Sequence, residues 1–202
     1  MTASDNRSAP GRPREFDIDA AVESAMQVFW TRGYNGTSLV DLIDGTGLSR
    51  GSLYKAFGDK HGLFLAALDR YISVSSVQLI NNLRKPGSVK AALRETLSLF
   101  AQLSCAADGS RGCMLVATAT EMAPYDAGVA ERVKAMMDRI RDAYAAAIAR
   151  GQASGEIPAR HDAESLAELI VCLTHGMRVV GKVGPTEKQM AAVVDTAMAL
   201  FD

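Results

Sequence analysis

The side chains best suited to chemistry lie between residues 37 and 60 of this 202-residue chain. Cationic and hydroxyl-bearing residues recur there at short spacing: Thr37, Ser38, Arg50, Ser52, Tyr54, Lys55 and Lys60. Such groups donate hydrogen bonds to phosphate oxygens, and arginine also donates to the edges of bases. The sequence offers no paired carboxylates, no metal-ligand spacing and no nucleophile–base set for catalysis. We therefore expect an anion-binding surface rather than an enzyme, with neither a metal nor a cofactor.

One serine in this segment has a competing enzymatic interpretation. The run Gly47-Leu48-Ser49-Arg50-Gly51 matches the G-x-S-x-G turn that presents the nucleophile of α/β-hydrolases. That turn needs a preceding strand and a sheet that carries the partner histidine and acid. A helix is predicted before Ser49 instead, and the serine hydroxyl is placed to cap the next helix. We therefore reject the hydrolase interpretation.

Two short helices joined by a turn must position these residues. Thr37 and Ser38 supply hydroxyl caps for the first helix, and Ser49 caps the second. Gly45 and Gly47 are expected to bracket the turn, because glycine reaches positive φ without steric cost. Apolar spacing turns one set of residues inward: Leu39, Leu42, Ile43, Leu53 and Phe57. The second helix presents a polar outer face: Arg50, Gly51, Ser52, Tyr54 and Lys55. This is the arrangement that places a recognition helix in the major groove of DNA.

Bulk charge gives this interpretation no support. The net charge is −1, and residues 1–60 contain seven Lys or Arg residues against eight Asp or Glu residues. The prediction therefore depends on placement, because Arg50, Lys55, Lys60 and His61 cluster around the second helix. The alternative is a sensor that uses the helical hairpin to dock a protein partner rather than DNA.

Residues 15–65 resemble the DNA-binding domain of the tetracycline-repressor (TetR) family of bacterial transcription regulators. The turn glycines, Tyr54, Phe57, Lys60 and the pair Leu63–Phe64 fall at that family's spacing. The resemblance implies a double-stranded DNA operator as partner, contacted by Ser38 among other residues.

The resemblance also assigns roles within the motif. It implies that Arg50, Gly51 and Ser52 approach base edges. It implies phosphate contacts for four further residues: Thr37, Tyr54, Lys55 and Lys60. Arg12 and Arg14 either enter the minor groove or track the backbone, although a solvated tail is the simpler interpretation.

Helical periodicity continues to the C-terminus without strand candidates. We expect an all-α chain of about nine helices in three parts: a disordered arm (1–14), a helix-turn-helix domain (15–62) and a ligand-binding and dimerisation domain (63–202). Phe16 and Asp17 should form a hydrophobic staple and N-cap for the first helix. Its inward face is expected to be Ile18, Val22, Ala25 and Phe29, with Gly33 ending it in the left-handed region.

The larger domain places polar groups among methionine and aromatic residues. The candidates for a ligand cavity are Phe100, Cys113, Met114, Thr118, Glu121, Met137, Tyr144 and His175. Methionine suits a cavity that accepts varied shapes, and a few polar groups would orient the ligand. The alternative is a packed core in which Tyr144 and His175 satisfy each other or backbone groups.

Cys113 is a candidate thiol sensor. It follows Arg111-Gly112 at a predicted helix start, and both a cation and a helix N-terminus stabilise a thiolate. The position also resembles that of electrophile-sensing cysteines in the family. A small apolar residue at a helix start is the competing interpretation. Cys105 and Cys172 are expected in the core, with Cys105 available as a resolving partner.

Three cysteines, no signal peptide and no membrane-spanning run predict a reduced, cytoplasmic protein.

The last two predicted helices are apolar over broad faces, which favours a homodimer over a monomer core. The sequence therefore predicts a dimeric, DNA-binding transcriptional regulator, released from a pseudo-palindromic operator by a small-molecule inducer or an electrophile.

Overall fold

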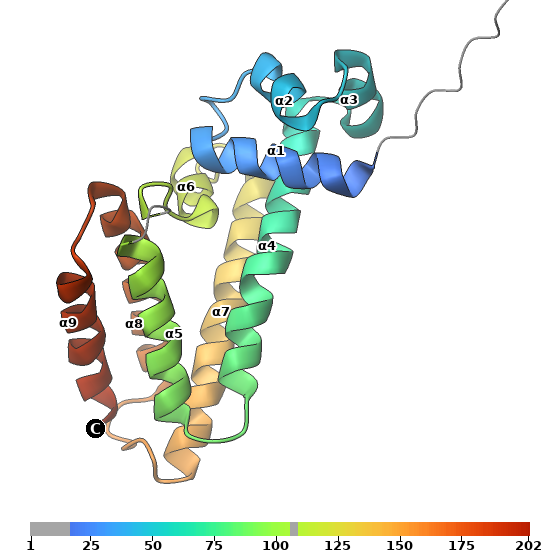
Figure 1. Ribbon diagram of the computed structural model, residues 1–202. Coiled ribbons are helices and arrows are strands. Elements are labelled where there is room, and N and C mark those ends of the chain that lie inside the picture. The colour runs from blue at the N-terminus through green and yellow to red at the C-terminus, as the bar shows by residue number, and fades with distance from the viewer. Residues whose placement is uncertain (1–16, 106–108) are drawn as a thin grey trace, which may run out of the picture.

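The computed structural model describes residues 17–105 and 109–202, and within those ranges it contains α-helices and short 3-10 turns but no strand (Figure 1). The helices are α1 (Ile18–Arg32), α2 (Leu39–Thr46), α3 (Arg50–Phe57), α4 (Lys60–Arg84), α5 (Val89–Cys105), α6 (Met114–Glu121), α7 (Ala127–Ala153), α8 (Ala163–Val180) and α9 (Glu187–Met198). The 3-10 turns η2 (Gly181–Val183) and η3 (Ala199–Phe201) follow α8 and α9. The predicted all-α class is confirmed.

The first three helices form a head around the upper end of α4 (Figure 1). Ser38 caps α2 with a full capping box, and Ser49 caps α3 by accepting from Ser52 N. Gly47 ends α2 in the left-handed region, with φ 68° and ψ 9°, as predicted. Gly45, however, is helical rather than part of the turn. A Cβ there would lie 2.4 Å from Val28 Cγ2, so this glycine lets α2 approach α1 closely.

Helix α1 differs from its prediction at both ends. Asp17 caps it as expected, accepting from the amides of Asp19 and Ala20, but Ile18 is 54% exposed. The buried face is instead Ala21, Ala25, Met26 and Phe29. Gly33 has φ 73° and ψ 173°, which is a glycine conformation outside the left-handed helical region. The Phe16 staple and the DNA contacts of Arg12 and Arg14 lie outside the described residues.

Helix α4 runs without interruption from the head into the body, and Asp59 caps its N-terminus by accepting from Gly62 N. It is long and apolar enough to cross a membrane by length and composition alone. Its buried face nevertheless packs within the protein core, including Leu63, Phe64, Leu68 and Leu83. A core helix explains its composition.

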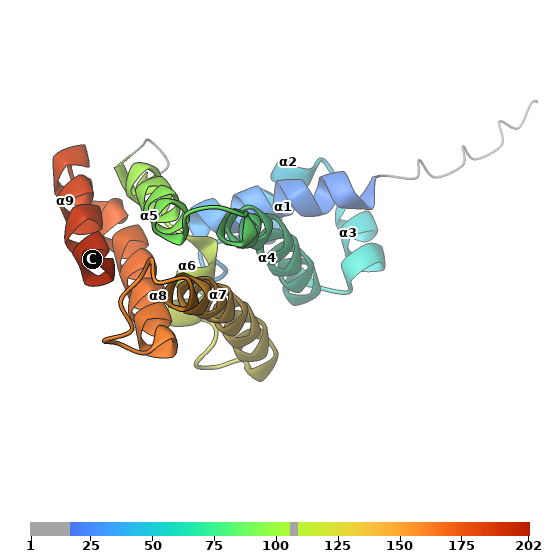
Figure 2. The same cartoon turned by 90° about the horizontal axis from the view of Figure 1, so that it is seen from below.

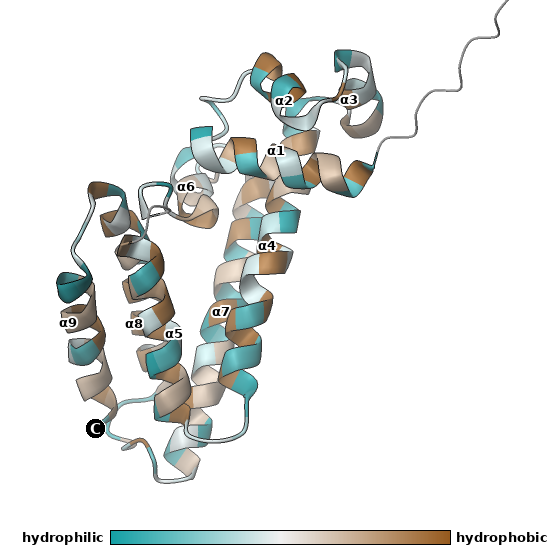
Figure 3. Ribbon diagram, viewed as in Figure 1, coloured by the Kyte–Doolittle hydropathy of each residue, from teal (hydrophilic) through white to brown (hydrophobic). Residues whose placement is uncertain are grey.

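The body consists of the remaining helices packed in layers, with α7 between α4 and α8 (Figure 2). Hydrophobic and hydrophilic residues alternate along these helices, as burial of one face requires (Figure 3). Helix α9 packs chiefly on α5 and lies at the edge of the molecule farthest from α3. Its position leaves the outer faces of α8 and α9 uncovered in the monomer.

Candidate nucleic-acid interface

Helix α3 packs on the core through Leu53 and the half-buried Phe57, and it presents a polar face outward. Leu53 is fully buried, whereas Arg50, Gly51, Tyr54 and Lys55 are exposed. A Cβ at Gly51 would meet only Ser49 Oγ, at 3.9 Å. Gly51 is therefore not needed for packing within the monomer, and its bare backbone leaves room for a close approach by another molecule.

The cations of this face are available for binding. The Arg50 guanidinium lies 5.5 Å from the centre of the Tyr54 ring, and the Lys60 ammonium lies 4.3 Å from the centre of the Tyr34 ring. Within residues 17–105 and 109–202, no carboxylate forms an ion pair with Arg50, Lys55 or Lys60. Lys60 also begins α4, where the helix dipole favours an anion.

Thr37 and Ser38 have different environments, although the sequence predicts DNA contacts for both. Ser38 is exposed, and its hydroxyl donates to Asp41 Oδ2 at 2.7 Å. Hydrogen bonds from Ser38 lower the pKa of Asp41, which keeps the capping carboxylate charged. Thr37 is only 2% exposed, and its hydroxyl donates to the Gly33 carbonyl at 2.6 Å. The Thr37 hydroxyl closes the turn between α1 and α2, and a phosphate contact of Thr37 stays a prediction.

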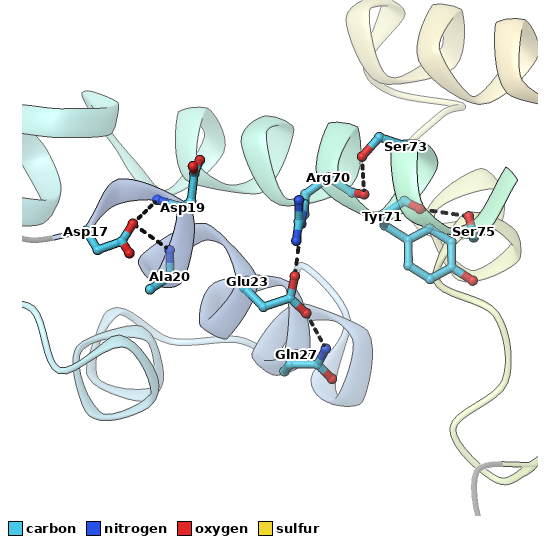
Figure 4. A network of polar contacts seen from close by, with 9 residues as sticks. All are labelled: Asp17, Asp19, Ala20, Glu23, Gln27, Arg70, Tyr71, Ser73 and Ser75. Carbon is cyan, nitrogen blue, oxygen red and sulfur yellow. Dashed lines mark hydrogen bonds and ion pairs between the residues drawn. The ribbon is translucent and has the colours of Figure 1, made fainter. Parts of the chain in front are cut away.

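The head is anchored to the body by polar contacts along α1. Figure 4 shows Glu23 of α1 between Gln27 of the same helix and Arg70 of α4. Arg70 Nε donates to the Glu23 carboxylate at 3.0 Å. The Arg70 hydrogen bond is the main cause of the lowered pKa of Glu23. The Glu23–Arg70 ion pair is half-exposed, so it adds little to the free energy of folding. Its main effect is to fix the orientation of α1 relative to α4.

Glu121 joins α6 to the turn that follows α1. Its carboxylate accepts from Tyr34 N at 3.0 Å and from Asn35 N at 2.7 Å. A Cβ on Gly33 would lie 2.8 Å from Glu121 Oε2, so a larger residue there would displace this carboxylate, and the φ of 73° itself favours glycine. The sequence predicts Glu121 as a ligand residue, and in the structure its carboxylate binds backbone amides of the head.

A second contact between head and body lies nearby. His61 Nε2, in the first turn of α4, lies 2.6 Å from Asp126 Oδ2, just before α7. The pKa of Asp126 is lowered, first by the Val129 amide that it caps and then by His61. Together, the Glu121 and His61–Asp126 contacts hold α2, α3 and the start of α4 in one orientation relative to α6 and α7.

Cys113 lies at a junction of head and body. Its Sγ is 3.3 Å from the Tyr71 hydroxyl, and burial is the main cause of the raised pKa of Tyr71. The preceding Gly112 carbonyl accepts from Trp30 Nε1 of the head at 3.2 Å and from Arg178 Nη2 of α8 at 2.5 Å. The Cys113 thiol therefore lies next to hydrogen bonds made by both parts of the molecule.

Sequence reasoning missed several residues of this junction. Trp30 stacks under the Arg111 guanidinium at 4.0 Å, and Arg111 Nη2 donates to Gln27 of α1. Arg178 is 5% exposed and also donates to the Leu103 carbonyl. The available signal was an arginine on the apolar side of the sequence that forms α8, because a buried cation needs a partner.

The other predicted ligand residues differ in burial. Met114, Thr118 and Tyr144 are buried, whereas Phe100, Cys113, Met137 and His175 are half-buried. Four cavities open between α4 and α5, α5 and α9, α4 and α7, and α8 and α9, and none of the predicted ligand residues lines them.

The packed-core alternative for Tyr144 and His175 also fails in detail. The Tyr144 hydroxyl is buried without a hydrogen-bond partner in the described structure, so the two side chains do not satisfy each other. Burial raises the pKa of Tyr144 and lowers that of His175. Of the remaining cysteines, Cys172 is exposed rather than in the core, and Cys105 is half-buried.

The faces of α8 and α9 leave apolar surface uncovered. A hollow of about 420 Å³ lies between them, lined by apolar residues that include Leu169, Leu173, Val193 and Leu200. Leu169 is 46% exposed, and a Cβ added to Gly176 would meet nothing within 4 Å. This surface fits a twofold copy of the same two helices.

Comparisons with known proteins agree with this architecture. A family model described as bacterial regulatory proteins, tetR family, matches residues 21–67. A second, described as the tetracyclin repressor-like C-terminal domain, matches residues 89–197. The HTH-type transcriptional repressor ComR of Escherichia coli (strain K12) is 33% identical over 199 residues, which cover 96% of this chain and 93% of ComR.

Further relatives extend the similarity. An uncharacterized HTH-type transcriptional regulator of Bacillus subtilis (strain 168), YezE, is 28% identical over 95% of this chain and 100% of its own length. Among solved structures, a cysteine mutant of the TetR family transcriptional regulator CifR, complexed with 26-bp double-strand operator DNA, is 31% identical. It superposes with a TM-score of 0.83 over 95% of this chain and 100% of that chain.

Proposed function

The chain belongs to the TetR family of bacterial transcriptional regulators, and from that membership we propose that it is a homodimeric repressor whose release from DNA is controlled by a ligand or by Cys113. The relative ComR is named as a repressor, and the CifR structure is a complex with operator DNA. Regulators of this family act in the cytoplasm, and we assign this chain to the same compartment.

One observation carries the DNA-binding proposal. Arg50, Lys55 and Lys60 surround an exposed helix and form no ion pair with any described carboxylate. Their charge is therefore free to replace the counterions of DNA phosphates. Tyr54 adds an exposed hydroxyl on the same face, and Gly51 leaves the backbone of α3 accessible.

A dimer would double this surface. Two recognition helices about 34–36 Å apart meet successive major grooves on one side of the duplex. A signal bound to the body can release DNA only if it has a higher affinity for a different separation of the two heads.

The DNA-binding proposal is tested on an operator selected from random duplexes. Arg50→Ala, if Arg50 reads a base, should weaken binding about 5- to 100-fold and relax specificity at one position. Lys55→Ala should weaken binding to all sequences and reduce the slope of log affinity against log salt by about one. Lys134→Ala is the control, because Lys134 is exposed on α7 and paired with Asp138.

Retention of full affinity by both head variants would contradict the proposal. A wild-type protein that selects no sequence would instead favour a sensor acting through a protein partner. The oligomeric state, measured in parallel by light scattering, separates loss of DNA contacts from loss of the dimer.

Thiol control is tested separately. An electrophile with an activated C=C bond forms a C–S bond with the Cys113 thiolate, and the resulting carbanion takes a proton from water. The adduct cannot keep the Tyr71 contact at 3.3 Å, so we expect the Gly112 junction to shift and the operator to be released. Cys113→Ser should stay bound after exposure to N-ethylmaleimide, whereas the exposed Cys172→Ser control should be released like the wild type. Equal release of both variants would exclude Cys113 as the sensor.

A further inference from the structure

The Lys60 side chain lies over an aromatic ring instead of pairing with a carboxylate. Its ammonium is 4.3 Å from the centre of the Tyr34 ring, which is within the range of a cation–π contact. Lys60 is half-buried and forms no ion pair with any described carboxylate. The carboxylate of the preceding Asp59 is used to cap α4, accepting from Gly62 N at 2.7 Å. The Tyr34 ring is therefore the described partner of this cation.

Helix stability does not explain a lysine at this position. Lys60 is the first residue of α4, and the N-terminus of a helix carries the positive end of the dipole. A cation is unfavourable there, and no acidic residue in the first turn offsets it beyond the Asp59 cap. The same dipole attracts an anion from outside, so Lys60 is better suited to binding a phosphate than to stabilising α4.

The Tyr34 ring is fixed by the core of the head and by the body. Its centre lies 4.9 Å from that of the Phe64 ring, edge to face, and 6.2 Å from that of Phe29. Both phenylalanines are 2% exposed. The Tyr34 backbone amide donates to the Glu121 carboxylate of α6 at 3.0 Å. A ring held in this way can restrict the side chain that lies over it.

The contact depends on the ring and not on the tyrosine hydroxyl. The Tyr34 hydroxyl forms no hydrogen bond with another described residue. Burial raises the pKa of Tyr34, so the ring carries no charge of its own at neutral pH. The attraction for Lys60 therefore comes from the negative face of a neutral ring.

We propose that Tyr34 is a positioning residue for DNA binding: its ring holds the Lys60 ammonium in place for a backbone phosphate. A lysine that is free in solution loses rotamer freedom when it binds, and ordering it beforehand is worth about 2- to 10-fold in affinity. The ring covers one side of the ammonium, and N–H groups on the other sides can donate to phosphate oxygens. This role rests on the proposed DNA-binding function, and it requires no contact between Tyr34 and DNA.

Fluorination of the ring tests this role, because fluorine withdraws negative charge from the ring face while it changes the shape of the ring little. Phenylalanine, 3,5-difluorophenylalanine and pentafluorophenylalanine are placed at position 34 of the full-length protein. Affinity for a selected operator is measured at several salt concentrations, with Tyr34→Phe as the reference because it keeps the ring. The pentafluoro variant should bind about 2- to 10-fold more weakly than Tyr34→Phe, with the difluoro variant between them.

A double-mutant cycle assigns the effect to Lys60. Lys60→Ala alone should weaken operator binding and reduce the slope of log affinity against log salt by about one. In the Lys60→Ala background the three ring variants should bind equally, because the ring no longer has a cation to hold. The same fluorinated residues at Phe100 of α5 are the control and should leave affinity unchanged, since no described cation lies over that ring.

Equal operator affinity of the three ring variants would overturn this role, as would a decrease with fluorination that persists in the Lys60→Ala background. An unchanged salt slope in Lys60→Ala would also overturn it, because Lys60 would then bind no phosphate. If circular dichroism shows that the pentafluoro variant does not fold, the difluoro variant decides. These outcomes leave the proposed function intact while Arg50→Ala and Lys55→Ala still weaken binding, whereas a wild type that selects no operator concerns the proposed function itself.

Discussion

At the scale of single residues, Glu156 fixes the start of α5. Its carboxylate accepts from Val89 N at 2.8 Å, from Lys90 N at 3.0 Å and from the Ser88 hydroxyl. The Ser88 hydrogen bond is the main cause of its lowered pKa. A carboxylate at a helix N-terminus also interacts favourably with the dipole.

This contact predicts a pH dependence of stability. Because the folded pKa of Glu156 lies below its ordinary value of 4.5, its contribution is present above that pH and is lost as pH falls through the folded pKa. Glu156→Gln should lower the free energy of unfolding at pH 7 by about 0.5–1 kcal/mol, a small value because the site is solvent-screened. Urea unfolding at pH 7, 5 and 3.5 should show the difference from wild type shrinking.

The exposed Glu131 of α7 provides the control for this experiment, because its side chain forms no hydrogen bond or ion pair with another described residue. Glu131→Gln should leave the free energy of unfolding nearly unchanged at each pH. A constant difference between Glu156→Gln and wild type across the three pH values would contradict the linkage.

At the scale of elements, α6 sets the orientation of the head through Glu121. Glu121→Gln keeps one acceptor oxygen but turns an NH2 group toward the other amide, so one of the two hydrogen bonds is lost. Amide hydrogen exchange at Tyr34 or Asn35 should become about 5- to 30-fold faster, which corresponds to about 1–2 kcal/mol. Thr120→Ala, on the exposed neighbouring position, should leave both amides at wild-type rates.

Unchanged exchange at both amides in Glu121→Gln would show that packing alone holds the turn. Faster exchange spread over the whole body would indicate a general loss of stability rather than release of the head.

The sequence could predict helices and caps because their signals are local. Ser49, Asp59, Asp162 and Ser38 each precede an apolar-periodic run and cap it. The exposed face of α3 was likewise predictable from the spacing of Leu53. The positions of α5, α7 and α8 followed from the same periodicity.

Contacts between distant segments could not be predicted in this way. Glu121 and Tyr34 are 87 residues apart. The sequence around Glu121 does not show whether its carboxylate accepts hydrogen bonds from backbone amides or contacts a ligand. Gly45 was misassigned for a related reason. Its role depends on Val28 of α1, a neighbour brought close by tertiary packing.

At the scale of the whole molecule, the uncovered faces of α8 and α9 predict a dimer. Leu169→Glu places a charge in the hollow that the partner would fill, and desolvation of that charge should prevent association. Sedimentation should show a monomer with wild-type helix content, and operator affinity should fall at least about 100-fold because the second half-site is no longer tethered.

Val74→Glu is the matched control for the dimer, because Val74 is similarly exposed but lies on α4. It should remain dimeric. A Leu169→Glu protein that sediments as a dimer would place the interface elsewhere.

The shared carbonyl of Gly112 has a consequence for mutational robustness. Trp30 and Arg178 both donate to a main-chain atom, which every amino acid supplies, so altering a side chain at position 112 cannot delete this acceptor. What restricts the position to glycine is its φ of 71°, a backbone conformation that other residues rarely adopt. The acceptor itself can be removed only by changing the backbone chemically. Substitution of neighbouring side chains can therefore change how the protein responds to a ligand, while the Gly112 carbonyl remains available to accept from the head and from α8.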